Sequence, residues 1–249
     1  MEKLKILETN VDRANMASAK EFCVKKIEND QKNFVVTANS EIIYRASKDK
    51  ALSDLINSAD LIVPDGIGVV LASKIIGKPL TQRVTGIDLM MDLMDYAEKT
   101  GKSVYLLGGK RGVADAAAEA LKAKFPDIKI AGSYHGYYKG IQNGNEGHKE
   151  ELEVISIINK EKPDMLFVAL GFPAQEKFIY KYKDEISARL FIGVGGSFDV
   201  ISGNVKRAPD FYQKHGLEWL YRLIKEPSRL KRSAALPKFA LKVLLRRGK

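Results

Sequence analysis

The chain contains very few of the residues that build disulfides and metal sites. It has one cysteine, Cys23, and three histidines, His135, His148 and His215, which are scattered along the sequence. A single cysteine excludes an intramolecular disulfide and a cysteine cluster for zinc, and we expect Cys23 to be a small buried side chain. No Asp-x-Asp motif occurs, so we expect no cofactor and no required metal, although one carboxylate with substrate phosphates suffices to hold Mg²⁺.

Long apolar runs are also missing. The longest apolar stretches have the length of a strand, so we expect no transmembrane helix, and residues 1–8 lack the apolar region of a signal peptide. The 249 residues, 45% apolar and 29% charged, are typical of one α/β core or of a core of about 200 residues with an appendage. We therefore expect a cytoplasmic protein that attaches peripherally to the inner face of the cell membrane.

The net charge is concentrated at the C-terminal end. Residues 206–249 contain 13 Lys/Arg and 3 Asp/Glu, a balance of +10 that equals the net charge of the whole chain. A cationic end on a neutral body indicates an anionic partner: phospholipid, a diphosphate or nucleic acid. Apolar residues recur there at helical spacing beside Lys238, Lys242 and Arg246, which is typical of a helix in a bilayer interface. These apolar residues are Leu236, Phe239, Ala240, Val243 and Leu244. The alternative is a basic helix packed on the body.

Short apolar runs alternate with helical patterns along the rest of the chain. We predict strands at Phe34–Thr37, Leu61–Val63, Ser103–Leu107, Lys129–Ser133, Met165–Leu170 and Leu190–Val194. Helical stretches such as Ser40–Ser58, Asp88–Thr100 and Gly112–Phe125 lie between them. Such alternation predicts an α/β fold with a Rossmann-like, doubly wound, mostly parallel sheet. We expect this catalytic domain at 1–204 and a helical, basic, membrane-binding appendage at 205–249.

Polar residues follow the first two predicted strands, where ligands bind in such sheets. Thr37 and Asn39 end the first strand. Asn39 or Ser40 is expected to cap the next helix, and short polar side chains here can also orient a sugar or a base. Asp65 follows the second strand between a proline and a glycine. A carboxylate at this place suits a general base, but Pro-Asp-Gly is equally typical of a turn.

The next two motifs precede helices. Asp88 is expected to be an N-cap, and Arg83 is either a surface cation or a ligand for phosphate near that helix. The glycine-rich turn 108–112 is able to face a phosphate. It lacks the spacing of a dinucleotide motif and of a P-loop, so neither a nicotinamide enzyme nor an NTPase is predicted.

The last two predicted strands lead to Gln175 and to a run of glycines. Gly195, Gly196 and Asp199 follow the sixth strand, where the backbone can approach a nucleotide closely. A tight turn is the structural alternative.

Seven segments in this order carry a resemblance to a known family. They are Thr-Ala-Asn-Ser-Glu (37–41), Pro-Asp-Gly (64–66), Arg-Val-Thr-Gly-Ile-Asp-Leu (83–89), Gly-Phe-Pro-Ala-Gln-Glu (171–176), Gly-Val-Gly-Gly-Ser-Phe-Asp (193–199), Arg-Ala-Pro (207–209) and Gly-Leu-Glu-Trp-Leu-Tyr-Arg (216–222). Together they resemble the WecG/TagA/CpsF family of bacterial glycosyltransferases. The resemblance implies inverting transfer of N-acetylmannosamine (ManNAc) from UDP-ManNAc to the 4-hydroxyl of GlcNAc-diphosphoundecaprenol, in wall teichoic acid synthesis.

The resemblance also implies roles for the residues that match. Asp65 matches the proposed base, and Thr37, Asn39 and Gln175 match polar pocket residues. Arg83 is a candidate for substrate contact, and Gly195, Gly196 and Asp199 lie against the nucleotide. Arg222, Arg229 and Arg232 match arginines that reach over the site to bind diphosphate, although Pro227 can break the helix between them.

Alternatives remain open at this point. In the first alternative the chain is a member of the same family, but its donor is UDP-ManNAcA or UDP-glucose. In the others the chain is a non-catalytic anionic-lipid- or nucleic-acid-binding module, or a soluble nucleotide-dependent enzyme. Interleaved aromatic platforms are not evident, so we expect an anionic membrane surface and no nucleic acid as partner, with homo-oligomers possible off the membrane.

Overall fold

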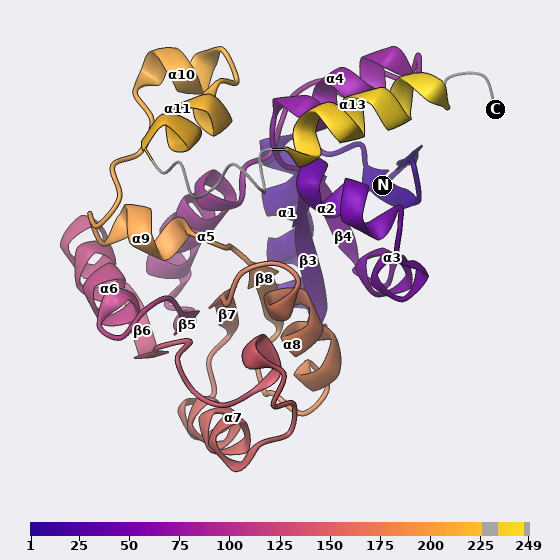
Figure 1. The fold of residues 1–249 in the computed structure, drawn as a ribbon. Coiled ribbons are helices and arrows are strands. Elements are labelled where there is room, and N and C mark those ends of the chain that lie inside the picture. Colours follow the sequence, from indigo (N-terminus) through magenta and orange to yellow (C-terminus); the bar gives the residue numbers. More distant parts are fainter. Residues whose placement is uncertain (226–233, 247–249) are drawn as a thin grey trace.

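A six-stranded parallel sheet forms the centre of the protein, in the order β4-β3-β8-β7-β5-β6 (Figure 1). The computed structural model describes residues 1–225 and 234–246. The strands of this sheet are β3 (Asn33–Ala38), β4 (Leu61–Pro64), β5 (Ser103–Gly108), β6 (Lys129–Tyr134), β7 (Met165–Ala169) and β8 (Leu190–Gly193). All six predicted strands are confirmed, as is the parallel α/β fold.

Helices cover both faces of the sheet, and each face has its own cluster of buried apolar side chains. One face is covered by α2 (Ser40–Ala46), α3 (Lys50–Asn57), α4 (Ile67–Ile75), α7 (Lys149–Glu161), α8 (Ala174–Tyr182) and α13 (Ala235–Leu245). The other is covered by α1 (Met16–Glu28), α5 (Gly86–Thr100), α6 (Val113–Lys124) and α9 (Ser197–Ile201). Cys23 is buried on α1, as predicted.

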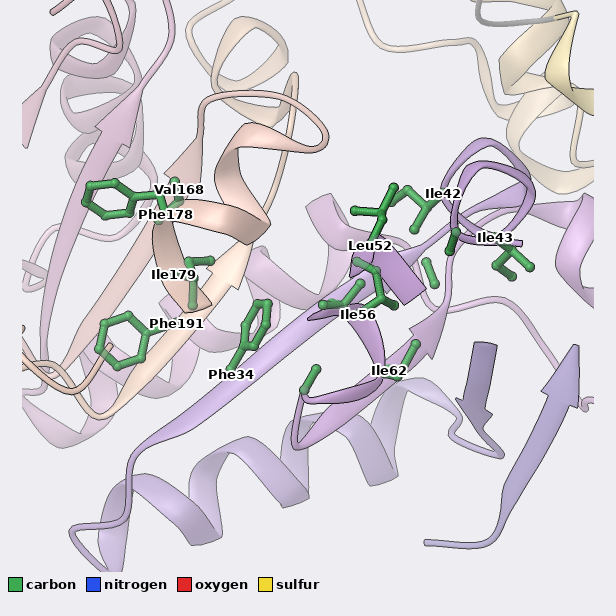
Figure 2. Packing of buried hydrophobic residues seen from close by; sticks show 14 of the residues in the cluster. Phe34, Ile42, Ile43, Leu52, Ile56, Ile62, Val168, Phe178, Ile179 and Phe191 are labelled. Atoms are coloured by element: carbon green, nitrogen blue, oxygen red, sulfur yellow. The ribbon is translucent and has the colours of Figure 1, made fainter. Parts of the chain in front are cut away.

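Strand register places apolar side chains of neighbouring strands on the same face. Phe34 of β3 pairs with Phe191 of β8, and both are fully buried. Figure 2 shows them among side chains of the covering helices, with Ile179 on α8 and Ile56 on α3. This packing holds β3 and β8 side by side, and the ends of these two strands form the centre of the candidate active site.

Helix boundaries differ from the prediction at two places. The predicted helix Ser40–Ser58 is two helices, because Asp49 caps α3 by accepting a hydrogen bond from the Leu52 N–H at 3.1 Å. The predicted N-cap role of Asp88 is wrong. Thr85 caps α5, and its Oγ1 accepts from the Asp88 N–H at 3.3 Å. The hairpin of β1 (Lys3–Ile6) and β2 (Thr9–Asp12) was not predicted.

The C-terminal part contains α10 (Asp210–Lys214), α11 (Glu218–Lys225) and α13. Figure 1 shows α10 and α11 (orange) apart from α13 (yellow), which lies against α4 and α2. Phe239 and Val243 of α13 are buried in the core cluster beside α2, so the expectation that they enter a bilayer is wrong. Within the described ranges, no helix combines the length and apolar character needed to cross a membrane.

Candidate active site

The predicted site residues lie where the parallel strands end, around the neighbouring strands β3 and β8. The chain leaves β3 into α2 on one face of the sheet, and it leaves β8 into α9 on the opposite face. Connections that diverge in this way open a crevice between two strand ends, which is where doubly wound sheets bind ligands. The segments after β3, β4, β7 and β8 all reach this edge.

Thr37 and Gln175 tie these strand ends together. Both are buried, and the Thr37 hydroxyl donates to the Gly193 carbonyl at 3.0 Å. Gln175 accepts a hydrogen bond from the Gly195 N–H at 3.0 Å and donates to Glu176 Oε1 at 2.9 Å. The two predicted pocket residues therefore hold the turn after β8 in place.

Glu176 is a buried carboxyl group for which the sequence predicted no role. It is 1% exposed, and burial raises its pKa to about 7. Its Oε2 has no hydrogen-bond partner among residues 1–225 and 234–246. The sequence did contain one signal for Glu176, because it is an acidic residue next to Gln175 within a motif that matches the family. The sequence pattern did not show that its carboxyl group is buried.

Asp65 and Asn39 lie on adjacent strand ends. The Asp65 N–H donates to the Ala38 carbonyl at 2.9 Å, which holds its loop against the end of β3. Asp65 is partly buried and directly follows the end of β4, as the sequence predicted. Asn39 caps α2, as predicted, because its Oδ1 accepts from the N–H groups of Glu41 and Ile42 at 3.0 and 3.1 Å.

The predicted nucleotide-facing residues lie between the end of β8 and the first turn of α9. Gly195 has φ of +52°, a conformation that favours glycine, and Gly196 is exposed. Asp199 lies in the first turn of α9 and is partly exposed. These three residues are thus together at the end of β8, beside the buried Gln175.

Arg83 bonds to two C-terminal helices, α10 and α11. Its Nη1 donates to Glu218 Oε2 at 2.5 Å and its Nη2 donates to the Gln213 carbonyl at 2.8 Å. Arg207 forms a second pair nearby, with its Nη2 2.7 and 2.8 Å from the two carboxylate oxygens of Asp88. Glu218 and Arg207 were within the matched motifs, yet no pairing partner was predictable for either of them.

The remaining predicted residues are only partly described. Arg222 lies in α11, but nothing is described of its side chain, and Arg229, Arg232 and Pro227 lie outside the described residues. Over the described part of the chain, no three His, Cys, Asp or Glu side chains are grouped so that they could hold a metal ion. His148 instead caps α7.

Comparison with known proteins agrees with the motifs. The profile of the Glycosyl transferase WecG/TagA/CpsF family matches residues 4–249. A Bacillus spizizenii protein named N-acetylglucosaminyldiphosphoundecaprenol N-acetyl-beta-D-mannosaminyltransferase is 45% identical over 211 residues, which cover 85% of this chain and 78% of the relative. A Staphylococcus aureus protein of the same name is 36% identical over 243 residues, covering 97% and 92%. With its parallel sheet and these strand-end motifs, the chain belongs to the WecG/TagA/CpsF family of glycosyl transferases.

Proposed function

We propose that the protein transfers ManNAc from UDP-ManNAc to the 4-hydroxyl of GlcNAc-diphosphoundecaprenol, with inversion at the anomeric carbon. The names of the relatives describe a transfer of this kind. The observation that carries the proposal is the position of Asp65 at the end of β4, held against the end of β3 by its own N–H. A carboxylate at the end of β4 supports the proposal, because doubly wound sheets bind ligands at the carboxyl ends of their strands.

Asp65 acts as the base in this proposal. It takes the proton of the acceptor 4-hydroxyl while that oxygen forms a bond to the anomeric carbon of the sugar. The bond from this carbon to the diphosphate oxygen breaks, and its electron pair leaves with UDP. Thr37, Asn39 and Gln175 shape the sugar pocket.

Stabilisation of the departing UDP is assigned to the protein itself. Gly195, Gly196 and Asp199 face the nucleotide, since the two glycines have no side chains and let the nucleotide approach the backbone closely. Arg222, Arg229 and Arg232 are proposed to bind diphosphate. No metal ion takes part in the proposed reaction.

We further propose attachment to an anionic membrane surface through α13. Phe239 and Val243 pack inward, whereas Leu241, Leu244 and Leu245 are exposed. Exposed leucines on a basic helix insert into the bilayer interface while cations contact lipid phosphates. Without lipid, the same apolar surface favours self-association.

A donor panel tests the proposed function. The purified protein is given UDP-ManNAc, UDP-ManNAcA or UDP-glucose with GlcNAc-diphosphate on a short soluble lipid. We expect efficient transfer from UDP-ManNAc and a β-linked product. Preference for UDP-ManNAcA or UDP-glucose would show that the enzyme uses a different donor substrate from the one proposed. If no donor supports transfer, the result would favour a non-catalytic lipid-binding module.

A further inference from the structure

The turn between α10 and α11 lies directly on the loop that follows Asp65. Gly216 in this turn has φ of +69°, and a Cβ atom there would lie 2.7 Å from Cβ of Ile67. Ile67 begins α4, two residues after Asp65. Contact this close leaves no room for a side chain at position 216. The pair of helices α10 and α11, which we call the α10–α11 hairpin, therefore lies beside the proposed base.

Two arginines lie beside the hairpin, and each has a nitrogen within 4.0 Å of the Glu218 carboxylate. Arg83, which belongs to the body, donates to Glu218 at the start of α11 and to the Gln213 carbonyl in α10. Arg207, which precedes α10, donates to Asp88 in the first turn of α5. We call Arg83, Asp88, Arg207 and Glu218 the clasp.

The clasp is sheltered from solvent at its centre. The side chains of Arg83 and Glu218 are 21% and 15% exposed. Partly buried arginine–carboxylate pairs with direct hydrogen bonds are stronger than exposed pairs. The pair is therefore suited to fix the position of α11 relative to the body.

This geometry bears on the role of Arg83. Two of its five N–H donors are already bonded to protein oxygens, and one of these oxygens belongs to the Glu218 carboxylate, which neutralises the charge that would attract a phosphate. Arg222, which is predicted to bind diphosphate, lies four residues after Glu218 in the same helix. A displacement of α11 would therefore displace Arg222 as well.

We infer that Arg83 and Glu218 are positioning residues: they hold the α10–α11 hairpin as a wall of the active site beside Asp65. Arg83 thus acts on the reaction through Glu218, not as a ligand for a substrate phosphate. The inference rests on the proposed function for its effect on turnover, but the contacts themselves do not depend on which sugar is transferred.

A double-mutant cycle separates the two roles of Arg83. Arg83→Ala and Glu218→Ala should each lower kcat by about 10- to 100-fold, because a displaced wall misplaces the reacting groups. The turnover of the double variant should be at most about threefold lower than that of the slower single variant, because the Arg83–Glu218 contact is already lost in each single variant. Affinity for UDP should fall by a similar factor in all three variants, because each of them displaces Arg222 together with α11.

Hydrogen exchange gives a readout that is independent of activity. Amides of residues 210–225 should exchange faster in both single variants, because the hairpin loses its attachment. Arg189→Ala is the matched control, since it removes the Arg189–Asp30 pair outside the clasp and the proposed site. It should leave turnover, UDP affinity and exchange at 210–225 unchanged.

Two outcomes would overturn the inference. In the first, Arg83→Ala loses turnover and UDP affinity while Glu218→Ala keeps both, which makes Arg83 a substrate ligand. In the second, exchange at 210–225 does not change in either variant. If the wild-type protein transfers no sugar at all, the proposed function fails, while the exchange measurement still decides whether the clasp holds the hairpin.

Discussion

The side-chain oxygen of Gln175 lies 3.0 Å from the backbone nitrogen of Gly195 and accepts its hydrogen bond. One side chain at the start of α8 thereby fixes the turn after β8, on the neighbouring strand. Gln175 also crowds that strand, because a Cβ atom at Gly193 would lie 2.4 Å from its Nε2. The glycine at 193 and the glutamine at 175 therefore depend on each other.

Gly193→Ala should destabilise the protein and weaken binding of UDP. The added methyl group displaces Gln175 and releases the Gly195 turn, at a cost of about 1–3 kcal/mol for overpacking. Thermal unfolding and UDP titration measure the two effects. Gly196→Ala is the control for stability alone, because no atom lies within 4 Å of a Cβ there and its φ is −81°. Equal losses of stability in the two variants would contradict this account of Gly193.

Glu176 should make stability fall as the pH rises. Burial raises its pKa from 4.5 to about 7, so the folded protein binds a proton there that the unfolded chain releases. The contribution to stability is complete below pH 4.5 and is lost as the pH rises through about 7. Its size is on the order of a few kcal/mol.

Glu176→Gln isolates this effect. The variant keeps the shape of the side chain but cannot titrate, so its free energy of unfolding should fall less than that of wild type between about pH 4.5 and pH 7. Denaturant unfolding at a series of pH values measures the difference. Parallel curves for the two proteins would show that Glu176 does not titrate in this range.

The sheet was predictable from the sequence because its strands other than the edge strand β6 are short, largely apolar runs that are buried on both faces. Each short apolar run bounded by turn residues marked one strand, and parallel order placed the motifs at a common edge. The rules for helix capping were less reliable where two neighbouring residues could both serve as the N-cap. Thr85 and Asp88 are both good N-caps, and the structure uses Thr85.

Contacts between distant segments were not predictable in the same way. The amphipathic spacing around Phe239 is compatible with a bilayer and with a protein core, and only the fold shows that Phe239 packs against the body. Likewise, Arg83 and Glu218 are 135 residues apart, so their pairing required the three-dimensional arrangement. Sequence alone left Arg83 as a candidate phosphate ligand.

Substitutions on the two faces of α13 should have different effects. Phe239→Ala should cost about 3–5 kcal/mol of stability, because a buried aromatic side chain is removed from the core. Leu241→Ser with Leu245→Ser should leave thermal stability unchanged and reduce binding to anionic liposomes, since both leucines are exposed. Wild-type liposome binding by the double variant would exclude these leucines from membrane attachment.

Transfer should not require a divalent metal. The sequence has no Asp-x-Asp motif, and arginines are proposed to stabilise the leaving diphosphate. Turnover measured in excess EDTA should equal turnover without chelator. A loss of activity that Mg²⁺ or Mn²⁺ restores would show that a metal stabilises the leaving group.

Asp65 is central to the proposed reaction, and the turnover of Asp65→Asn tests it most directly. The amide cannot accept the proton of the acceptor hydroxyl, so ManNAc transfer to a soluble lipid-linked acceptor should fall by roughly 10²- to 10⁴-fold. The affinity for UDP should stay close to that of wild type, because Asp65 is proposed to act on the acceptor hydroxyl and not on the nucleotide. A folded Asp65→Asn protein whose turnover lies within a few-fold of wild type would contradict the assignment of Asp65 as the base.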